Sequence, residues 1–342
     1  MALWADYVRN PGFRPADLER HRALHLSGLQ QSLSNPGEIA QRSFTYLLYG
    51  PDHAYGTTLA GRVETLKSFT RPDVVAFHQS WIRPDNAVIY AAGDTQLPVL
   101  VAALERGFGD WKVPARVKGV KSLDPVAPAM AARIVLIDKP GAAQSEIRVG
   151  QIVGTGLDPV NFELNAMNDV LGGGFTARLN MNLREGKGWT YGANSYVADA
   201  RGPQELGIAT SIQTDKTAEA LIEIDKELRG LQRDRPVTQE ELALLTKGQV
   251  LALPGQFETN QAMVSYLQQV NRFDRPYDYI TTLPARYAAL RPSSLTALAG
   301  ATLRPDKLSW VVVGDLAKIE ASVRKLGWNI EIWDSEGHQL RK

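Results

Sequence analysis

The spacing of hydrophobic and polar positions predicts both strands and helices in the second half of the chain. Short apolar runs of strand length occur at residues 134–138, 146–153, 189–197 and 205–212. Apolar residues three or four positions apart predict helices at residues 162–171 and 215–231, and Thr238 with Glu241 forms a capping box for a further helix to about Pro254. The pattern predicts an α+β fold in which an antiparallel sheet is covered by helices on one side.

One segment, residues 171–191, combines a glycine break, a short helix and a tight turn. An apolar stripe with a period of four predicts the helix, which should end near Arg184; it consists of Phe175, Leu179 and Leu183. Gly186 and Gly188 should stop this helix, because glycine adopts the left-handed conformation of a helix C-terminus at little cost. A strand should open at Trp189.

The predicted helix and strand bring the side chains of Arg184 and Tyr191 to the two sides of one turn. Arg184 leaves the helix where Tyr191 enters the strand, so a guanidinium and a phenol can converge on one point. Together they could hold a peptide carbonyl while negative charge develops on its oxygen. The spacing alone also fits a structural interpretation, in which Arg184 caps the helix and Tyr191 is a half-buried strand residue.

An internal repeat connects the two halves of the chain. Residues 83–86, Arg-Pro-Asp-Asn, precede an apolar run that ends at Gly93-Asp94, and residues 304–307, Arg-Pro-Asp-Lys, precede one that ends at Gly314-Asp315. An Arg-Pro pair and a helical stretch come before each copy. The shared order of helix, turn and buried strand predicts a duplicated domain.

The two copies differ in length. A proline-bearing stretch at residues 113–128 has the composition of a linker. We therefore expect residues 1–112 to be the second half of a domain whose N-terminal part is missing, and residues 129–342 to be a complete domain. The first residues after Met1 have the pattern of a helix interior without a cap, so the sequence is expected to be a fragment or a mis-started chain.

Composition narrows the classes of partner. The 342 residues include 38 basic and 37 acidic side chains, for a net charge of +1, so we expect neither nucleic acid nor a membrane surface as a partner. No run of eighteen apolar residues occurs, and without cysteine there can be no disulfide or thiolate chemistry. The triple glycine at residues 172–174 lacks the Lys-Ser/Thr of a phosphate loop, which argues against nucleotide binding.

Taken together, residues 171–191, the step from Arg184 to Tyr191, residues 134–145 and the two Gly-Asp runs resemble the M16 (insulinase/pitrilysin-like) zinc metallopeptidases. The likeness is greatest to the smaller bacterial and mitochondrial-processing-type members. It implies tandem duplicated α+β domains arranged as a clamshell. One half would carry a His-x-x-Glu-His helix and a zinc ion, and the other an arginine and a tyrosine.

The resemblance assigns roles to particular residues. Arg184 and Tyr191 would bind substrate carbonyls and stabilise the tetrahedral intermediate. Three neighbouring residues are predicted to bind the peptide substrate: Gly173, Gly174 and Phe175.

No metal ligand is predicted in this chain, and the zinc is expected in a partner subunit. His-x-x-Glu-His is absent from the sequence. The family's third ligand, a glutamate, would fall at Gly28 or Ser27, and neither side chain can bind zinc. His21 and His25 have the spacing of a metal pair, but no glutamate lies between them. They are expected beside Leu18 and Leu29 on the packed face of their helix, or at its edge.

Two hypotheses from different classes follow. In the first, the chain is the Arg/Tyr subunit of a heteromeric M16 peptidase that is inactive alone, acts on peptides and needs a zinc-bearing partner. In the second, it is an inactive M16-fold scaffold or interaction protein. An autonomous peptidase whose zinc motif lies upstream is a third possibility, which Gly28 disfavours. The periplasm is the expected compartment, with the cytoplasm as the alternative.

Overall fold

The computed structural model describes residues 1–341, which form two compact units. The first unit comprises Met1–Gln31, Leu59–Ser122 and Gly255–Gln269. The second comprises Ser32–Thr58, Leu123–Pro254 and the residues from Val270 onward. Each unit therefore draws on segments that are far apart in the sequence.

The first unit is helical. For most of their length the following elements belong to it: α1 (Ala2–Arg9), α2 (Pro15–Ser32), α4 (Val63–Ser68), α5 (Arg71–Trp81), η1 (Pro84–Asn86), α6 (Leu97–Phe108), η4 (Pro254–Phe257) and α11 (Asn260–Arg272). Helix α1 begins after Met1 without a side-chain cap, as predicted. It packs on α6 through Trp4 and Phe108, whose rings meet edge to face at 4.9 Å.

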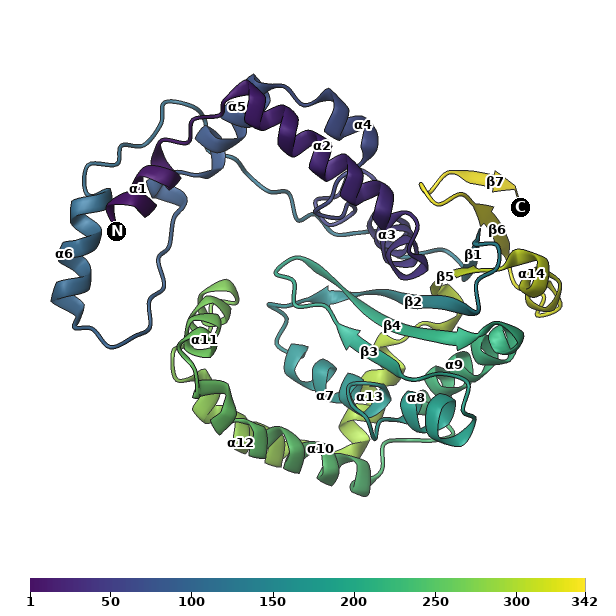
Figure 1. Ribbon diagram of the computed structural model, residues 1–342. Helices are drawn as coiled ribbons and strands as arrows, with labels where there is room; N and C mark the ends of the chain where they lie inside the picture. Colours follow the sequence, from purple (N-terminus) through teal and green to yellow (C-terminus); the bar gives the residue numbers. More distant parts are fainter. Residues whose placement is uncertain (342) are drawn as a thin grey trace. The chain divides into compact units, whose positions relative to one another are not determined.

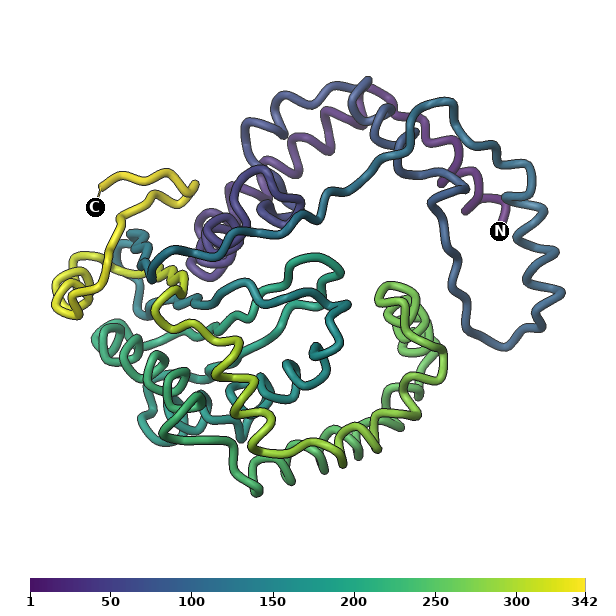
Figure 2. Tube along the Cα trace, turned by 180° about the vertical axis from the view of Figure 1, so that it is seen from behind, coloured from purple at the N-terminus to yellow at the C-terminus, as the bar shows by residue number. Residues whose placement is uncertain are grey.

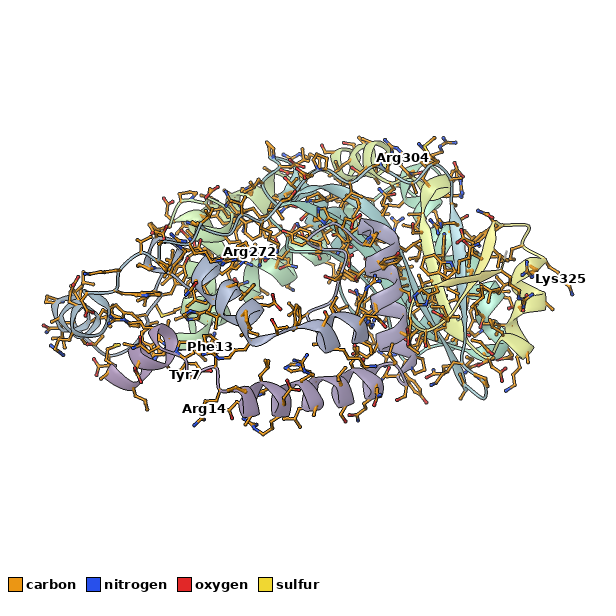
Figure 3. The ribbon with its side chains drawn as sticks, turned by 90° about the horizontal axis from the view of Figure 1, so that it is seen from above. Tyr7, Phe13, Arg14, Arg272, Arg304 and Lys325 are labelled. Carbon is orange, nitrogen blue, oxygen red and sulfur yellow. The ribbon has the colours of Figure 1, made fainter. Side chains whose placement is uncertain are left out.

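The loop between α1 and α2 contains a residue in the left-handed region. Phe13 has a φ of 45°, which is uncommon for a residue with a Cβ. Its carbonyl accepts a 2.8 Å hydrogen bond from Arg71 Nε, and its ring meets that of His78 edge to face. Figure 3 labels Phe13 in this loop, beside Tyr7 on α1 and Arg14 just before α2. These contacts with α5 hold the turn in its strained conformation.

The strand predicted after Asn86 is absent, and that prediction is wrong. Residues 87–92 form neither helix nor strand, and Val88 and Ile89 are exposed. Within the described residues of the first unit no strand is available to pair with them, and an unpaired strand leaves its backbone groups without partners. The preceding helix and turn of the repeat, α5 and η1, are both present. Residues 111–132, which include the predicted linker, also lack regular structure (Figure 2).

A seven-stranded sheet forms the centre of the second unit (Figure 1). Its strands are β1 (Arg133–Asp138), β2 (Gln144–Thr155), β3 (Ala193–Val197), β4 (Pro203–Gln213), β5 (Ser309–Gly314), β6 (Ile330–Trp333) and β7 (Gln339–Arg341). Their order is β3-β4-β2-β5-β1-β6-β7. The predicted strands at residues 134–138, 146–153 and 205–212 are thus confirmed with small changes of boundary.

The sheet is mixed rather than wholly antiparallel, which corrects one detail of the predicted α+β fold. Strand β5 inserts between β1 and β2, which are consecutive in the sequence and run in opposite directions. Because β5 is antiparallel to β2, it must be parallel to β1. Strand β6 also pairs with β1 in parallel, and Ile134 lies opposite Trp310 on one side and Ile330 on the other.

Helices cover both faces of this sheet, whereas the sequence predicted one. The first face packs against α7 (Asn161–Leu171), α8 (Arg178–Asn180), α9 (Thr217–Gln232), α13 (Pro292–Thr302) and α14 (Leu316–Arg324), with α10 (Gln239–Ala252) and α12 (Tyr279–Ala289) outside them. Short turns η3 (Thr214–Lys216) and η5 (Pro305–Lys307) precede α9 and β5. Helix α3 (Pro36–Tyr49) lies on the opposite face (Figure 1).

The burial of strand β5 shows why helices must pack on both faces of the sheet. All six of its residues are buried. Since successive side chains of a strand point to opposite faces, Trp310 and Val312 join the larger core while Val311 and Val313 pack under α3. The apolar run after Lys307 therefore predicts a strand that is buried on both sides.

The close approach of Gly172 to strand β3 gives a test of packing. A Cβ at position 172 would lie 2.5 Å from the backbone nitrogen of Ser195, which donates a hydrogen bond to the Gly172 carbonyl at 2.9 Å. Gly172→Ala should therefore lower the free energy of unfolding by about 1–3 kcal/mol, measured by urea denaturation. Gly174→Ala is the matched control, because its Cβ would meet nothing within 4 Å. Equal stability of the two variants would contradict the predicted steric role.

Candidate functional site

Arg184 lies in a wide helical turn that continues α8. After Asn180 the chain forms the π-helical segment η2 (Met181–Gly186), so the helix extends two residues past its predicted end. Leu179 and Leu183 are fully buried, as the apolar stripe predicted. Such π segments are rare and frequently occur at functional sites.

The turn at residues 186–188, called the glycine turn below, ends this helix as predicted. Gly188 has a φ of +66°, and its N–H donates to the Arg184 carbonyl at 2.9 Å. The N–H of Trp189 donates to the Leu183 carbonyl at 3.0 Å. The left-handed glycine and these two bonds fix the backbone on both sides of Arg184.

Phe175 lies outside the helix, so its predicted place on the apolar stripe is wrong. The helix begins at Arg178, and the Phe175 ring is exposed. The glycines before it break the helical pattern, so its spacing to Leu179 carries no helical meaning. The structure nevertheless brings Phe175 to Arg184, whose Cζ lies 4.7 Å from the ring centroid. This cation–π contact, with Glu185 Oε1 at 3.5 Å from Arg184 Nε, leaves the Arg184 side chain 39% exposed.

Tyr191 lies in a loop and not in a strand, because β3 begins only at Ala193. Its side chain is 90% exposed. The loop is held by Thr190, whose hydroxyl donates to the Gly192 carbonyl at 2.9 Å and accepts from Thr210 at 3.1 Å. No hydrogen bond, ion pair or ring contact joins Tyr191 to Arg184 in the described part of the chain. Both groups reach solvent, and their convergence on one carbonyl stays a prediction.

Gly173 and Gly174 line a pocket of about 280 Å³ between the end of α7 and helix α10. Gly173 is required by packing, since a Cβ there would lie 2.6 Å from the backbone Cα of Asp169. Gly174 has no such constraint. The predicted substrate-binding glycines thus form one wall of a cavity, and Phe175 follows them directly in the chain.

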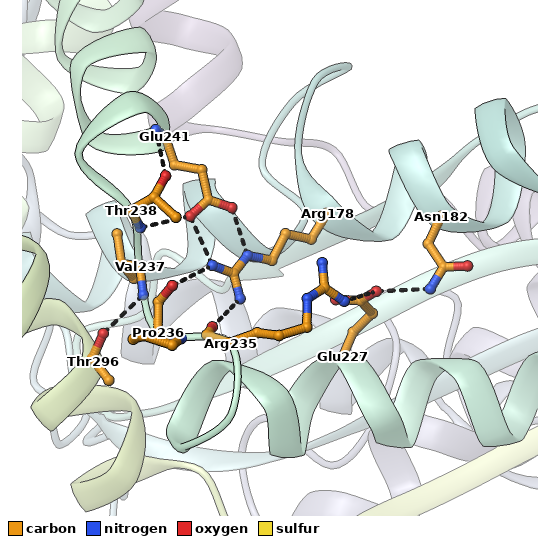
Figure 4. Close-up of polar contacts among 9 residues, drawn as sticks. All are labelled: Arg178, Asn182, Glu227, Arg235, Pro236, Val237, Thr238, Glu241 and Thr296. Atoms are coloured by element: carbon orange, nitrogen blue, oxygen red, sulfur yellow. Dashed lines mark hydrogen bonds and ion pairs between the residues drawn. The ribbon is translucent and has the colours of Figure 1, made fainter.

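The sequence did not reveal that a buried arginine anchors this region. Arg178 is only 5% exposed in its side chain and forms two hydrogen bonds with Glu241, at 2.6 and 2.7 Å (Figure 4). It also donates to the backbone carbonyls of Arg235 and Pro236, at 2.5 and 2.9 Å. Burial alone would raise the pKa of Glu241, but the hydrogen bonds from Arg178 and Thr238 outweigh it and hold that pKa below its usual value.

A second set of contacts ties η2 to helix α9. The Asn182 amide donates to Glu227 at 2.7 Å, and Arg235 pairs with the buried Glu227 at 2.7 Å (Figure 4). The same amide also donates to Glu223 at 2.9 Å. The helix that bears Arg184 is therefore fixed at Arg178 and again at Asn182. In the sequence, Arg178 stands between two apolar residues, Ala177 and Leu179, which are both buried. That position was the available sign that the arginine itself is buried.

The protonation of Asp169, on α7, makes the stability of the fold near the candidate site depend on pH. Burial raises the pKa of Asp169 to about 6, and the hydrogen bond from Gln249 at 2.8 Å opposes this only in part. The folded chain retains this proton up to pH 6, whereas the unfolded chain loses it near pH 4. The contribution of Asp169 to stability is therefore present below pH 4 and is lost as the pH rises to 6.

Asp169→Asn should consequently raise the free energy of unfolding at pH 7.5 by on the order of 1–3 kcal/mol. At pH 4 the variant and the original chain should differ little. Urea denaturation at both pH values checks this. A gain of equal size at the two values would show that the charge of Asp169 is not its cause.

The structure shows no metal centre among residues 1–341, since no three histidine, aspartate or glutamate side chains lie where they could share an ion. His21 and His25 are exposed on α2, and His25 lies one helical turn before the buried Leu29, so the pair lies at the edge of the packed face. Gly28 is also exposed on this helix. No helix in the described range is long and apolar enough to cross a membrane.

Comparisons with known proteins agree on one family. Residues 68–249, more than half of the chain, match the family model described as the peptidase M16 inactive domain. An uncharacterized zinc protease of Mycobacterium tuberculosis is 28% identical over 201 residues, which are 56% of this chain and 44% of that protein. An uncharacterized zinc protease of Bacillus subtilis is 24% identical over 239 residues, or 70% of this chain and 56% of that protein. The chain thus spans about half the length of these relatives.

Solved structures show the same fold. The crystal structure of a peptidase M16 inactive domain from Pseudomonas fluorescens matches with a TM-score of 0.80 and 23% identity, over 91% of this chain and 73% of that one. A protease from Helicobacter pylori matches with a TM-score of 0.82 and 18% identity, over 91% and 75% of the two chains.

Proposed function

This chain belongs to the peptidase M16 family, and on that premise we propose that it is the non-zinc subunit of a heteromeric metallopeptidase. Its match to the family's inactive domain and its lack of a metal-binding group within residues 1–341 both support a role without zinc. The zinc that activates water would be held by a separate M16 subunit. The substrates would be unfolded peptides.

The proposal rests on the position of Arg184, whose side chain is partly exposed on a firmly anchored helix. Its helix is anchored by the buried ion pair of Arg178 with Glu241, and its backbone is fixed by the turn at Gly188. Its guanidinium lies on the Phe175 ring and is partly exposed. Arginine stays charged at any working pH and offers several donors to a carbonyl oxygen. With the exposed hydroxyl of Tyr191 as a second donor, it would stabilise the oxyanion that forms when the peptide bond is attacked.

The proposal is tested by mixing. The purified chain alone should not cleave a fluorescence-quenched unfolded peptide, with or without added zinc. A zinc-bearing M16 subunit of the same organism should be weakly active alone and strongly active after the chain is added, and a chelator should abolish that activity. Cleavage by the chain alone, or no stimulation on mixing, would refute the subunit role.

A scaffold function is the alternative, and one observation favours it. Arg184 already contacts Phe175 and Glu185, and within residues 1–341 no hydrogen bond, ion pair or ring contact joins it to Tyr191. A scaffold would bind its partner and stimulate assembly but not hydrolysis. Substitutions of Arg184 and Tyr191 would then leave the activity of the mixture unchanged, whereas the catalytic role requires a large loss.

A further inference from the structure

The pocket between α7 and α10 contains the carboxylate of Asp169, which forms no ion pair with any residue that the structure describes. Its lining includes the apolar side chains of Val170, Leu244 and Leu245, together with Asp169 and Gln249. Glu241 also lines it, but Arg178 occupies both oxygens of that carboxylate. Asp169 accepts only the Gln249 amide hydrogen bond, at 2.8 Å, and no arginine or lysine within the described residues forms an ion pair with it.

This contrasts with the other acidic groups nearby. Glu241 pairs with Arg178 and Glu227 pairs with Arg235. Tyr287 on α12 lies close enough to Asp169 for the two to interact electrostatically, and it supplies no positive charge. Asp169 is thus a largely buried carboxylate whose neighbours on α7, α10 and α12 leave it without a cation.

The shape and polarity of the pocket match one kind of side chain. Lysine and arginine combine an apolar stem with a cationic head. The leucine and valine walls suit the stem, and the Asp169 carboxylate is the group that a cationic head would pair with. Because the Gln249 amide nitrogen already donates to Asp169, its oxygen is a second acceptor.

We infer that this pocket binds a lysine or arginine side chain of a peptide that passes over Gly173 and Gly174. This deepens the proposed function, since it rests on peptides being the substrates and selects those with a basic residue. Phe175 and Arg184 follow the glycine wall along the chain, so the pocket would hold a peptide beside the proposed carbonyl-binding group. The chemistry recognised is a primary ammonium or guanidinium on an alkyl chain.

The test measures binding to the chain alone, so it does not depend on the zinc-bearing partner. The probes are N-acetyl-lysine N-methylamide and its norleucine analogue, which differ in the terminal ammonium. Titration of the Asp169 carboxyl carbon by NMR should show its pKa lowered by at least one unit at saturating lysine probe and unchanged by the norleucine probe. An equal effect of both probes would overturn the inference.

Variants test the same pocket with peptides. A fluorescent peptide with one lysine should bind at least about tenfold more tightly than its norleucine counterpart at pH 7.5, and its affinity should fall as the pH drops to 5 and Asp169 gains a proton. Asp169→Asn should remove both the preference and its pH dependence. If the preference survives in this variant, the inference is wrong.

A substitution that fills the pocket tests the inference without changing Asp169, and it can be placed where it should not disturb the fold. Gly248 lies on α10 at the pocket wall, and a Cβ there would meet nothing within 4 Å. Gly248→Leu should fill the space, keep the helix and abolish binding of the lysine peptide. Gly300→Leu on α13 is the matched control, because that exposed glycine is equally unconstrained and lines no pocket described here. Full binding by Gly248→Leu would place the ligand elsewhere and refute the inference.

Discussion

Arg184→Ala should lower the rate at which the mixed two-subunit enzyme cleaves a peptide by about 10²–10³-fold, the loss typical of removing one donor to a developing oxyanion. The effect should appear mainly in kcat, because the donor is needed most when the negative charge forms. The folded chain should be unaffected, since the Arg184 side chain is partly exposed and contacts only Phe175 and Glu185. Steady-state kinetics and thermal unfolding of the same preparations measure the two quantities.

Tyr191→Phe should give a smaller loss in the same assay, because it removes a hydroxyl but no charge. Arg229→Ala is the matched control. Its guanidinium is 47% exposed and pairs with Asp225 and Asp306 at the surface, away from the glycine turn in the sequence. If Arg184→Ala and Tyr191→Phe both keep the full rate of the mixture, the proposed role of these residues is wrong and the scaffold hypothesis gains.

The second large effect concerns stability. Arg178→Ala should lower the free energy of unfolding by about 3 kcal/mol, because it breaks a buried ion pair and leaves two backbone carbonyls without their donor. This is the low end of the range for such pairs, since the Glu241 side chain retains 30% exposure and can recover some hydration. Urea denaturation followed by circular dichroism gives the value.

One further variant separates charge from shape at position 178, and a second variant at the surface serves as a control. Arg178→Lys should recover only part of the stability, because one ammonium cannot match the paired hydrogen bonds to Glu241 and also reach both carbonyls. Arg229→Ala should cost at most about 1 kcal/mol, as surface ion pairs usually do. A loss for Arg178→Ala no larger than that of Arg229→Ala would mean that the buried network does not anchor the helix.

The elements of the second unit could be predicted because local patterns dominate there. The apolar run after Lys307 is a strand, Thr238 and Glu241 form the expected capping box, and Gly188 closes the helix after Arg184. In each case the residues that specify the feature lie within a few positions of one another. The order of the strands in the sheet, in contrast, depends on contacts between residues far apart in the sequence. The insertion of β5 between β1 and β2 could therefore not be inferred from the hydrophobic pattern.

The errors at the candidate site have physical causes of the same kind. Phe175 has the right spacing for a helical stripe, but the glycines before it allow the helix to begin only at Arg178. The apolar run after Asn86 has the composition of a strand and no strand in its own unit to pair with. The partners of Arg178 lie more than fifty residues away, and the charge of Asp169 matters only because α10 folds over it.

The wide turn at Met181–Gly186 makes the aim of Arg184 sensitive to the number of residues in it. Each residue of a regular helix advances the chain by about 100°. Deleting a single position here would let the turn tighten and swing the guanidinium by roughly that angle relative to the Arg178 anchor. A chain one residue shorter would thus keep Arg184 and the Arg178 anchor and still point its arginine away from a substrate.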